Sequence, residues 1–279
     1  MASSAKRSSG FPSGWEILRP RTWQNRGLLA GLGNPDARHE LGRTPSLLAI
    51  HGFGGTPREV DLLVDVAKQL GLAASAPLLP GHGTRVKDMT RTRFEDWHHA
   101  ARSEFDRLRT QGDVVVAGLS LGGIIAAKLA AESNVAGLAL LANALWLHSP
   151  YPALWLSVAE RVPLPKSLWV PKLAPDIEDA KGRSEHLGYD AQLIYAAIEV
   201  YRGGRETRRV LGSITCPTLL MHGALDKVCP VSNARRTAGL LGTQDCTCVI
   251  LERSGHVLTR DHECDAVARQ FQAFLARFV

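Results

Sequence analysis

VVVAGLSLGG, residues 114–123, decides the fold, because a run of valines ends there in a serine that glycines flank on both sides. The valines are typical of a buried strand, and the following LGGIIAAKLAAE has the composition of a helix. A sharp turn from strand to helix needs small residues two positions before and two positions after its apex. Gly118 and Gly122 stand there around Ser120. The stretch predicts a strand–turn–helix with an exposed serine, and an ordinary strand ending in a loop is the alternative.

A serine hydroxyl is a weak nucleophile, so it needs a fixed position, a nearby base and donors for the oxyanion that its attack creates. The amide of Leu121 would lie at a helix N-terminus, where N–H groups point toward negative charge. A second glycine-rich bend, His51-Gly-Phe-Gly-Gly55, can present the amide of Phe53. We expect Phe53 and Leu121 to form an oxyanion hole. A plain turn ahead of a helix that begins near Pro57 is the alternative for the bend.

The candidate base and acid come late in the chain. His256 lies past the last predicted strand and before the C-terminal helix, which is where a catalytic base belongs when the order is serine, acid, histidine. Asp226 follows the predicted strand PTLLMH, so its loop emerges at the same edge of the sheet as Ser120. Glu252 is the rival acid, but at the end of a strand it is expected on the surface. We therefore predict Ser120, Asp226 and His256 as catalytic residues.

Short apolar runs alternate with segments of helical periodicity from about residue 46 onward. Apolar stripes mark a helix through Val60, Leu63 and Ala67 and another one at the C-terminus. This alternation is typical of an α/β fold with a mostly parallel, doubly wound sheet. The predicted strands are residues 46–51, 72–77, 113–118, 135–142, 217–222 and 246–251.

The alternation breaks over residues 145–212, which are rich in tryptophan and proline. We expect an inserted cap there, between core segments 41–144 and 213–279, because loops at the carboxyl ends of strands are where α/β sheets bind ligands. A second packing layer with no role in binding is the alternative. Residues 1–40 are predicted to be a partly disordered leader, and they contain no clear hairpin to open the sheet, which is expected to have few strands. The candidate substrate-binding residues are Phe53, Trp146 and Leu147.

Charge and composition limit the partners. The net charge is +6 over 279 residues, but the positive side chains are scattered, so a nucleic-acid partner is not expected. No run approaches the roughly 18 apolar residues of a membrane span, so stable membrane insertion is not expected either. The sequence carries no signal for an oligomeric state.

Cysteine usage and metal-ligand spacing bear on location and cofactors. Five cysteines are an odd number and favour reduced thiols, and the N-terminus lacks the apolar core of a signal peptide. These features predict a cytoplasmic protein. No zinc-ligand spacing and no dinucleotide or phosphate-binding glycine pattern is present, so the chemistry is expected to need no metal and no cofactor.

The sequence resembles the α/β-hydrolase superfamily, and within it the bacterial carboxylesterases and monoacylglycerol lipases. The resemblance covers residues 45–279 and rests on five motifs in order: HGFGG, PGHG, GLSLGG, HGALD and SGHVLTRD. It implies a Ser120–Asp226–His256 triad, oxyanion amides from Phe53 and Leu121, and a small cap over an acyl pocket.

The resemblance also implies a reaction, namely hydrolysis of small carboxylic esters with short to medium acyl chains through an acyl-enzyme on Ser120. The substrate is expected to be uncharged and partly apolar. Three alternatives stay open. The same triad could serve an acyltransferase or perhydrolase, or a hydrolase of carbon–carbon bonds; a non-catalytic ligand-binding module is disfavoured because no triad residue is missing.

Overall fold

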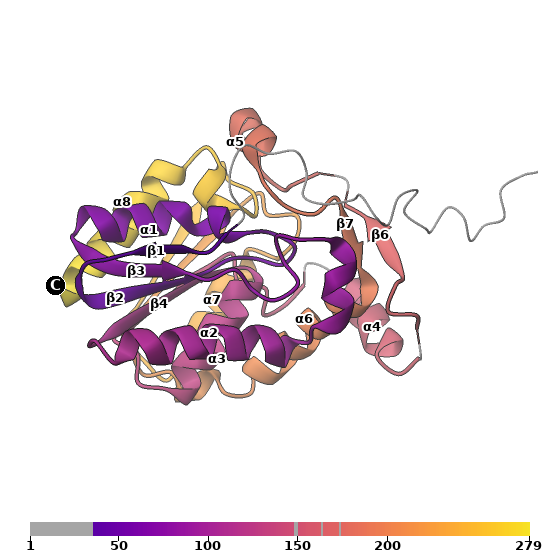
Figure 1. Ribbon diagram of the computed structural model, residues 1–279, viewed down its shortest axis with the longest axis horizontal. Helices are drawn as coiled ribbons and strands as arrows, with labels where there is room; N and C mark the ends of the chain where they lie inside the picture. Colours follow the sequence, from indigo (N-terminus) through magenta and orange to yellow (C-terminus); the bar gives the residue numbers. More distant parts are fainter. Residues whose placement is uncertain (1–35, 148–149, 163, 173) are drawn as a thin grey trace, which may run out of the picture.

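Buried apolar runs form the central sheet, in a computed structural model that describes residues 36–147, 150–162, 164–172 and 174–279. The sheet has seven strands in the order β1-β3-β2-β4-β5-β8-β9 (Figure 1). Neighbouring strands pair in parallel, except that β1 pairs antiparallel with β3. The strands are β1 Arg38–Glu40, β2 Arg43–Ile50, β3 Leu72–Ala76, β4 Val114–Leu119, β5 Gly137–Leu141, β8 Thr218–Gly223 and β9 Cys246–Leu251.

The predicted α/β fold is confirmed, and each of the six predicted strands coincides with an observed one to within a few residues. The seventh strand, β1, was missed. Its three residues, Arg38, His39 and Glu40, are polar and lie inside the segment predicted as a leader. They become a strand because they pair with Ala74–Ala76 of β3. The local sequence around residues 38–40 does not predict this pairing. The rest of that leader, residues 1–35, lies outside the described residues.

Helices cover both faces of the sheet, and alternate strand residues meet them. Leu47 and Ala49 of β2 pack with the apolar faces of α1 (Asp61–Gln69) and α8 (Cys264–Leu275). Leu48 and Ile50 point the other way, into the core that the opposite helices complete. Figure 1 shows α1 and α8 on one side of the sheet and α2 and α3 on the other. The opposite helices are α2 Phe94–Arg109, α3 Leu121–Glu132 and α7 Ser232–Ala238.

A long insertion separates β5 from β8, and most of it gathers beyond one end of the sheet, where Figure 1 shows α4, α6, β6 and β7 together. Its elements are α4 Pro150–Ala159, β6 Trp169–Pro171, α5 Ala180–Glu185, β7 Ala191–Leu193 and α6 Ile194–Thr207. The two strands pair antiparallel as a separate small sheet. The described ranges also contain five short 3-10 helices: Pro57–Val60, Val86–Arg91, Leu211–Ser213, Leu258–Arg260 and Ala276–Phe278.

None of the helices in the described part of the chain is both long enough and apolar enough to span a membrane. All five cysteines are free thiols.

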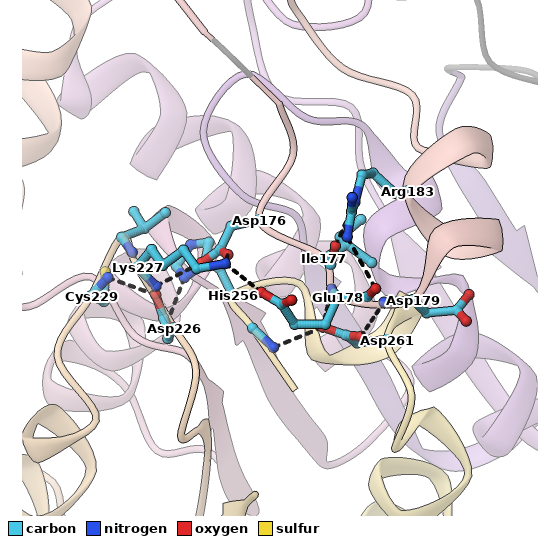
Figure 2. Close-up of polar contacts among 12 residues, drawn as sticks. Asp176, Ile177, Glu178, Asp179, Arg183, Asp226, Lys227, Cys229, His256 and Asp261 are labelled. Atoms are coloured by element: carbon cyan, nitrogen blue, oxygen red, sulfur yellow. Dashed lines mark hydrogen bonds and ion pairs between the residues drawn. The ribbon is translucent and has the colours of Figure 1, made fainter. Parts of the chain in front are cut away.

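Asp261 ties the insertion to the loop after β9 (Figure 2). Its buried carboxylate accepts the backbone N–H groups of Glu178 (2.9 Å) and Asp179 (2.8 Å) from the insertion. It also accepts those of Gly255 (2.7 Å) and His262 (2.8 Å) from its own loop. Burial alone would raise the pKa of Asp261, but these four donors hold it below its ordinary value. The ionised side chain therefore fixes two segments that are far apart in sequence.

Replacing Asp261 with Asn is expected to lower the free energy of unfolding at pH 7 by about 2–4 kcal/mol, because buried N–H groups lose a charged acceptor. The native pKa is depressed, so this stability is present above the unfolded-state pKa of about 3.9 and is lost as pH falls through the folded-state pKa. Urea unfolding at pH 7 and pH 3 measures both effects. The control is Asp265→Asn, at an exposed position of α8, and an equal loss in the two variants at pH 7 would contradict the prediction.

Candidate active site

Ser120 stands at the apex of a tight turn between β4 and α3, as predicted. Its backbone has φ 57° and ψ −113°, a conformation that costs energy for a residue with a side chain. The turn brings three segments so close that a Cβ on Gly118 would clash with the carbonyl of Gly122, and a Cβ on Gly122 would clash with the carbonyl of Ile50. The glycines are therefore required, and the predicted strand–turn–helix is confirmed. The serine was expected to be exposed, but it is buried, with only 7% of its surface accessible.

His256 and Asp226 form a buried pair at the same edge of the sheet (Figure 2). His256 Nδ1 lies 2.8 Å from Asp226 Oδ2. The other carboxylate oxygen accepts the N–H groups of Val228 (2.8 Å) and Cys229 (2.7 Å). His222 Nε2 lies 3.0 Å from Oδ2 and 3.3 Å from the carbonyl oxygen of Cys229. Because a carbonyl oxygen can only accept a hydrogen bond, His222 Nε2 carries a proton. The Asp226 carboxylate therefore faces four donors: the two imidazoles and the two backbone N–H groups.

The environment favours an ionised Asp226 and a basic His256. Burial alone would raise the pKa of Asp226, but His256, His222 and the Cys229 N–H hold it well below its ordinary value. Burial alone would lower the pKa of His256, but the carboxylates of Asp226, Asp176 and Glu59 raise it above 6.5. Since Nδ1–H donates to Asp226, Nε2 on the other side of the ring is left to accept a proton.

Ser120 and His256 line one cavity of about 410 Å³ between the sheet edge and the insertion. Both side chains face this cavity, but no hydrogen bond joins the Ser120 hydroxyl to His256 among the described residues. Most of the lining is apolar, and the insertion supplies much of it: Leu147, Trp155, Leu156, Val170, Ile194, Ala197 and Val200. Such a cavity can hold an apolar chain beside the serine.

The loop His51–Gly55 holds its peptide groups in fixed directions. Buried His51 accepts the Leu79 N–H at Nε2 (3.1 Å), so Nδ1 carries the ring proton and donates to the carbonyl of Gly52 (2.9 Å). Burial lowers the pKa of His51 to about 4, which keeps the ring neutral. In a trans peptide the N–H points opposite to the carbonyl, so the Phe53 N–H points away from His51. No acceptor in the described part of the chain receives it.

Leu121 follows Ser120 as the first residue of α3, and a helix leaves its first N–H groups without internal acceptors. Gly52, next to Phe53, lies against Ser120, since a Cβ on Gly52 would stand 3.3 Å from Ser120 Cβ. The N–H groups of Phe53 and Leu121 therefore come from the two segments that meet at Ser120, and their role as an oxyanion hole stays a prediction.

Glu59 is a site residue that the sequence analysis did not identify. It is buried, lines the cavity, and accepts the Gly52 N–H at Oε2 (2.8 Å). Burial raises its pKa. A Cβ on Gly55 would overlap the Glu59 carboxylate, which explains the glycine at this position. In the sequence, Glu59 resembles an ordinary acidic residue in the first turn of a helix after Pro57, so its contact with Gly52 gave no signal.

Of the predicted substrate-binding residues, Phe53 and Leu147 line the cavity and Trp146 does not. The expectation for Trp146 is corrected: the guanidinium groups of Arg208 (5.5 Å) and Arg236 (4.2 Å) lie over its ring, and cation–π attraction holds it there. Trp155 lines the cavity instead. Glu252, the rival acid, is exposed as expected.

The cavity also contains charged groups that the sequence analysis did not single out, namely Lys172 and Asp176 of the insertion. Burial lowers the pKa of the Lys172 ammonium, and the carboxylates of Glu59 and Asp176 oppose this shift. Within the described ranges, no cluster of three or more His, Cys, Asp or Glu side chains is arranged to hold a metal ion.

Comparison with known proteins places this fold and site in a family. The model of the family described as serine aminopeptidase, S33, matches residues 44–263. A thermostable monoacylglycerol lipase of Bacillus sp. (strain H-257) is 26% identical over 233 residues, which cover 83% of this chain and 90% of the lipase. A carboxylesterase of Bacillus subtilis (strain 168) is 24% identical over 241 residues, 85% of this chain and 94% of the esterase.

Solved structures show the same fold. A structure reported for the metagenome-derived lipolytic enzymes LipS and LipT has a TM-score of 0.81 at 24% identity, with coverage of 88% of this chain and 99% of that one. The monoacylglycerol lipase of Paleococcus ferrophilus has a TM-score of 0.72 at 19% identity, with coverage of 86% and 98%. The family match spans most of the chain, and the solved structures share its fold. The chain belongs to the serine aminopeptidase S33 family of α/β hydrolases.

Proposed function

We propose that this protein hydrolyses small carboxylic esters through an acyl-enzyme on Ser120. The observation that carries the proposal is that Ser120, on a strained turn, and His256, paired with Asp226, line the same cavity. These are the parts that acyl transfer by a serine requires. The names of the two Bacillus relatives, a monoacylglycerol lipase and a carboxylesterase, support the ester as substrate.

The proposed mechanism assigns one role to each group. Ser120 Oγ attacks the ester carbonyl carbon while His256 Nε2 takes the hydroxyl proton, and the N–H groups of Phe53 and Leu121 bind the oxyanion. His256 then donates this proton to the leaving alcohol. Asp226 holds the imidazole in the tautomer with Nδ1 protonated and stabilises its positive charge. Water, deprotonated by His256, attacks the acyl-enzyme, and the acid leaves as Ser120 regains its proton.

The substrate class follows from the cavity. Its mostly apolar lining favours a short or medium acyl chain, and residues 145–212 act as a cap over it, joined to core segments 41–144 and 213–279. The charged groups at Glu59, Lys172 and Asp176 occupy only part of the lining. A cytoplasmic location belongs to the same proposal, supported by five free thiols, since disulfides form in oxidising compartments.

The description of the family names an aminopeptidase, so amides are the first alternative to test. An aminoacyl p-nitroanilide, assayed beside a p-nitrophenyl ester, separates the two activities. Added alcohols or hydrogen peroxide as acyl acceptors test for acyl transfer and perhydrolysis, and a diketone tests for cleavage of carbon–carbon bonds. The ester proposal expects the p-nitrophenyl ester, with water as acceptor, to be turned over fastest.

Ser120→Ala is expected to lower kcat on p-nitrophenyl butyrate by about 10⁴-fold or more, because the nucleophile is gone while the fold remains. Initial rates and circular dichroism of the wild type and the variant measure both parts. Ser232→Ala, at an exposed position of α7, is the matched control and should keep full activity. Turnover that survives in folded Ser120→Ala would contradict the assignment.

Activity is expected to fall toward acidic pH with a midpoint above 6.5. The base must be neutral to take a proton, and the carboxylates around His256 raise its pKa above that value, so protonation inactivates the enzyme as pH falls through the raised pKa. The pH dependence of kcat/KM measures the midpoint in the free enzyme. An acid limb with a midpoint below 6.5 would show that a different group is the base.

Ala197→Trp is expected to shift the preferred acyl chain to shorter lengths, because Ala197 of α6 lines the cavity and an indole would fill part of its volume. Rates on p-nitrophenyl esters from acetate to palmitate measure the shift, and the acetate rate should change little. Ala180→Trp, on the exposed side of α5, is the control for adding an indole elsewhere. An unchanged chain-length profile in Ala197→Trp would show that the acyl chain does not occupy this cavity.

A further inference from the structure

Asp176 is a residue of the insertion that reaches the catalytic edge of the sheet. It lies between β6 and α5, its side chain is only 9% exposed, and it lines the cavity beside His256. Figure 2 shows Asp176 next to both Asp226 and His256. An acidic side chain with so little exposure needs partners, so its contacts reveal what it does.

The backbone of Asp176 holds the loop of the base. Its carbonyl oxygen accepts the N–H groups of His256 (3.0 Å) and Val257 (3.2 Å). His256 therefore makes hydrogen bonds with two other segments: its ring nitrogen Nδ1 with Asp226, and its backbone N–H with the carbonyl of Asp176 in the insertion. The direction of the imidazole depends on both.

The side chain of Asp176 holds the loop of the acid. Its Oδ2 accepts the N–H of Lys227, the residue after Asp226, at 2.7 Å. Its Oδ1 is buried and accepts no hydrogen bond among the described residues, with the ammonium of Lys227 3.8 Å away. One residue therefore joins the insertion to both loops whose side chains form the Asp226–His256 pair.

The charge of Asp176 also acts on His256. Three carboxylates from different elements face His256: Asp226 after β8, Asp176 in the insertion and Glu59 in the 3-10 helix before α1. The imidazole of His186, also in the insertion, interacts with His256 as well. Burial raises the pKa of Asp176 and Asp226 adds to that shift, while the Lys227 N–H, His256 and the Lys227 ammonium favour the ionised form. Lys172 also attracts the charge of Asp176.

We propose that Asp176 is a positioning residue that aligns the loops of Asp226 and His256 from the insertion and, through its negative charge, strengthens His256 as a base. This inference rests on the proposed function of Ser120 and His256. It makes the insertion part of the catalytic apparatus as well as a cover over the acyl chain, because the contact that orients the base starts in the insertion.

Two variants separate the roles of charge and position. Asp176→Asn keeps a carbonyl oxygen that can accept the Lys227 N–H but removes the charge. Its acid limb in kcat/KM on p-nitrophenyl butyrate is expected to move to lower pH by on the order of one unit. Its plateau is expected to stay within about threefold of the wild type. Asp176→Ala removes the charge and the side-chain acceptor of the Lys227 N–H but keeps the backbone carbonyl, so the acid limb should move equally and the plateau should fall about 10- to 100-fold.

Glu178→Gln is the matched control, because Glu178 lies in the same segment and pairs with the Lys227 ammonium at the surface. It should leave the acid limb and the plateau unchanged. An acid limb in Asp176→Asn that coincides with the wild type, or an equal shift in Glu178→Gln, would overturn the role of the charge. A wild-type plateau in Asp176→Ala would overturn the role in positioning.

The rate at which a fluorophosphonate labels Ser120, measured over the same pH range, reports His256 without any ester. If the wild type turns over no ester but the fluorophosphonate labels its Ser120 rapidly, the proposed substrate class fails. The role of Asp176 is then still tested by the labelling rates of the Asp176 variants. If the labelling rate of Asp176→Asn follows the wild type at every pH, the inference fails while ester hydrolysis stands.

Discussion

The rest of the site depends on one steric constraint, the approach of β2, β4 and α3 around Ser120. The turn is so tight that Gly118 and Gly122 have no room for a Cβ, and Ser120 itself adopts a positive φ. In return, the serine side chain and the first N–H of α3 occupy fixed positions at the sheet edge. The other predicted catalytic residues reach this edge on separate loops: Phe53 follows β2, Asp226 follows β8 and His256 follows β9.

Much of the fold could be predicted from the sequence because its signals are local. Buried parallel strands are continuous apolar runs, and the turn at Ser120 needs glycines at fixed spacing, so both are visible in a short window. The strand β1 was not visible, since three polar residues become a strand only by pairing with β3. His256 and Asp226 were found because each follows a recognisable strand, and the structure brings them to 2.8 Å.

The parts of the site that could not be predicted depend on contacts between distant segments. Glu59 and Asp176 are ordinary acidic residues in their local sequence, and only the fold brings one to the Gly52 N–H and the other to the loops of Asp226 and His256. Trp146 and Trp155 are equally plausible pocket residues by composition. Two arginines from α7 and from the end of α6 hold Trp146 away from the cavity, and no periodicity within residues 145–212 reveals that.

The bond between Asp261 and the insertion has a consequence for synthesis. Glu178 and Asp261, which share a hydrogen bond, are 83 positions apart in the sequence. The carbonyl of Asp176 likewise accepts its hydrogen bonds from the N–H groups of His256 and Val257, which are made much later. A ribosome makes the insertion long before it makes the loop after β9. A nascent chain thus carries Ser120 on its turn without an aligned base until the loop after β9 has emerged. The contacts that orient His256 can form only after β9 and the loop that follows it have been made.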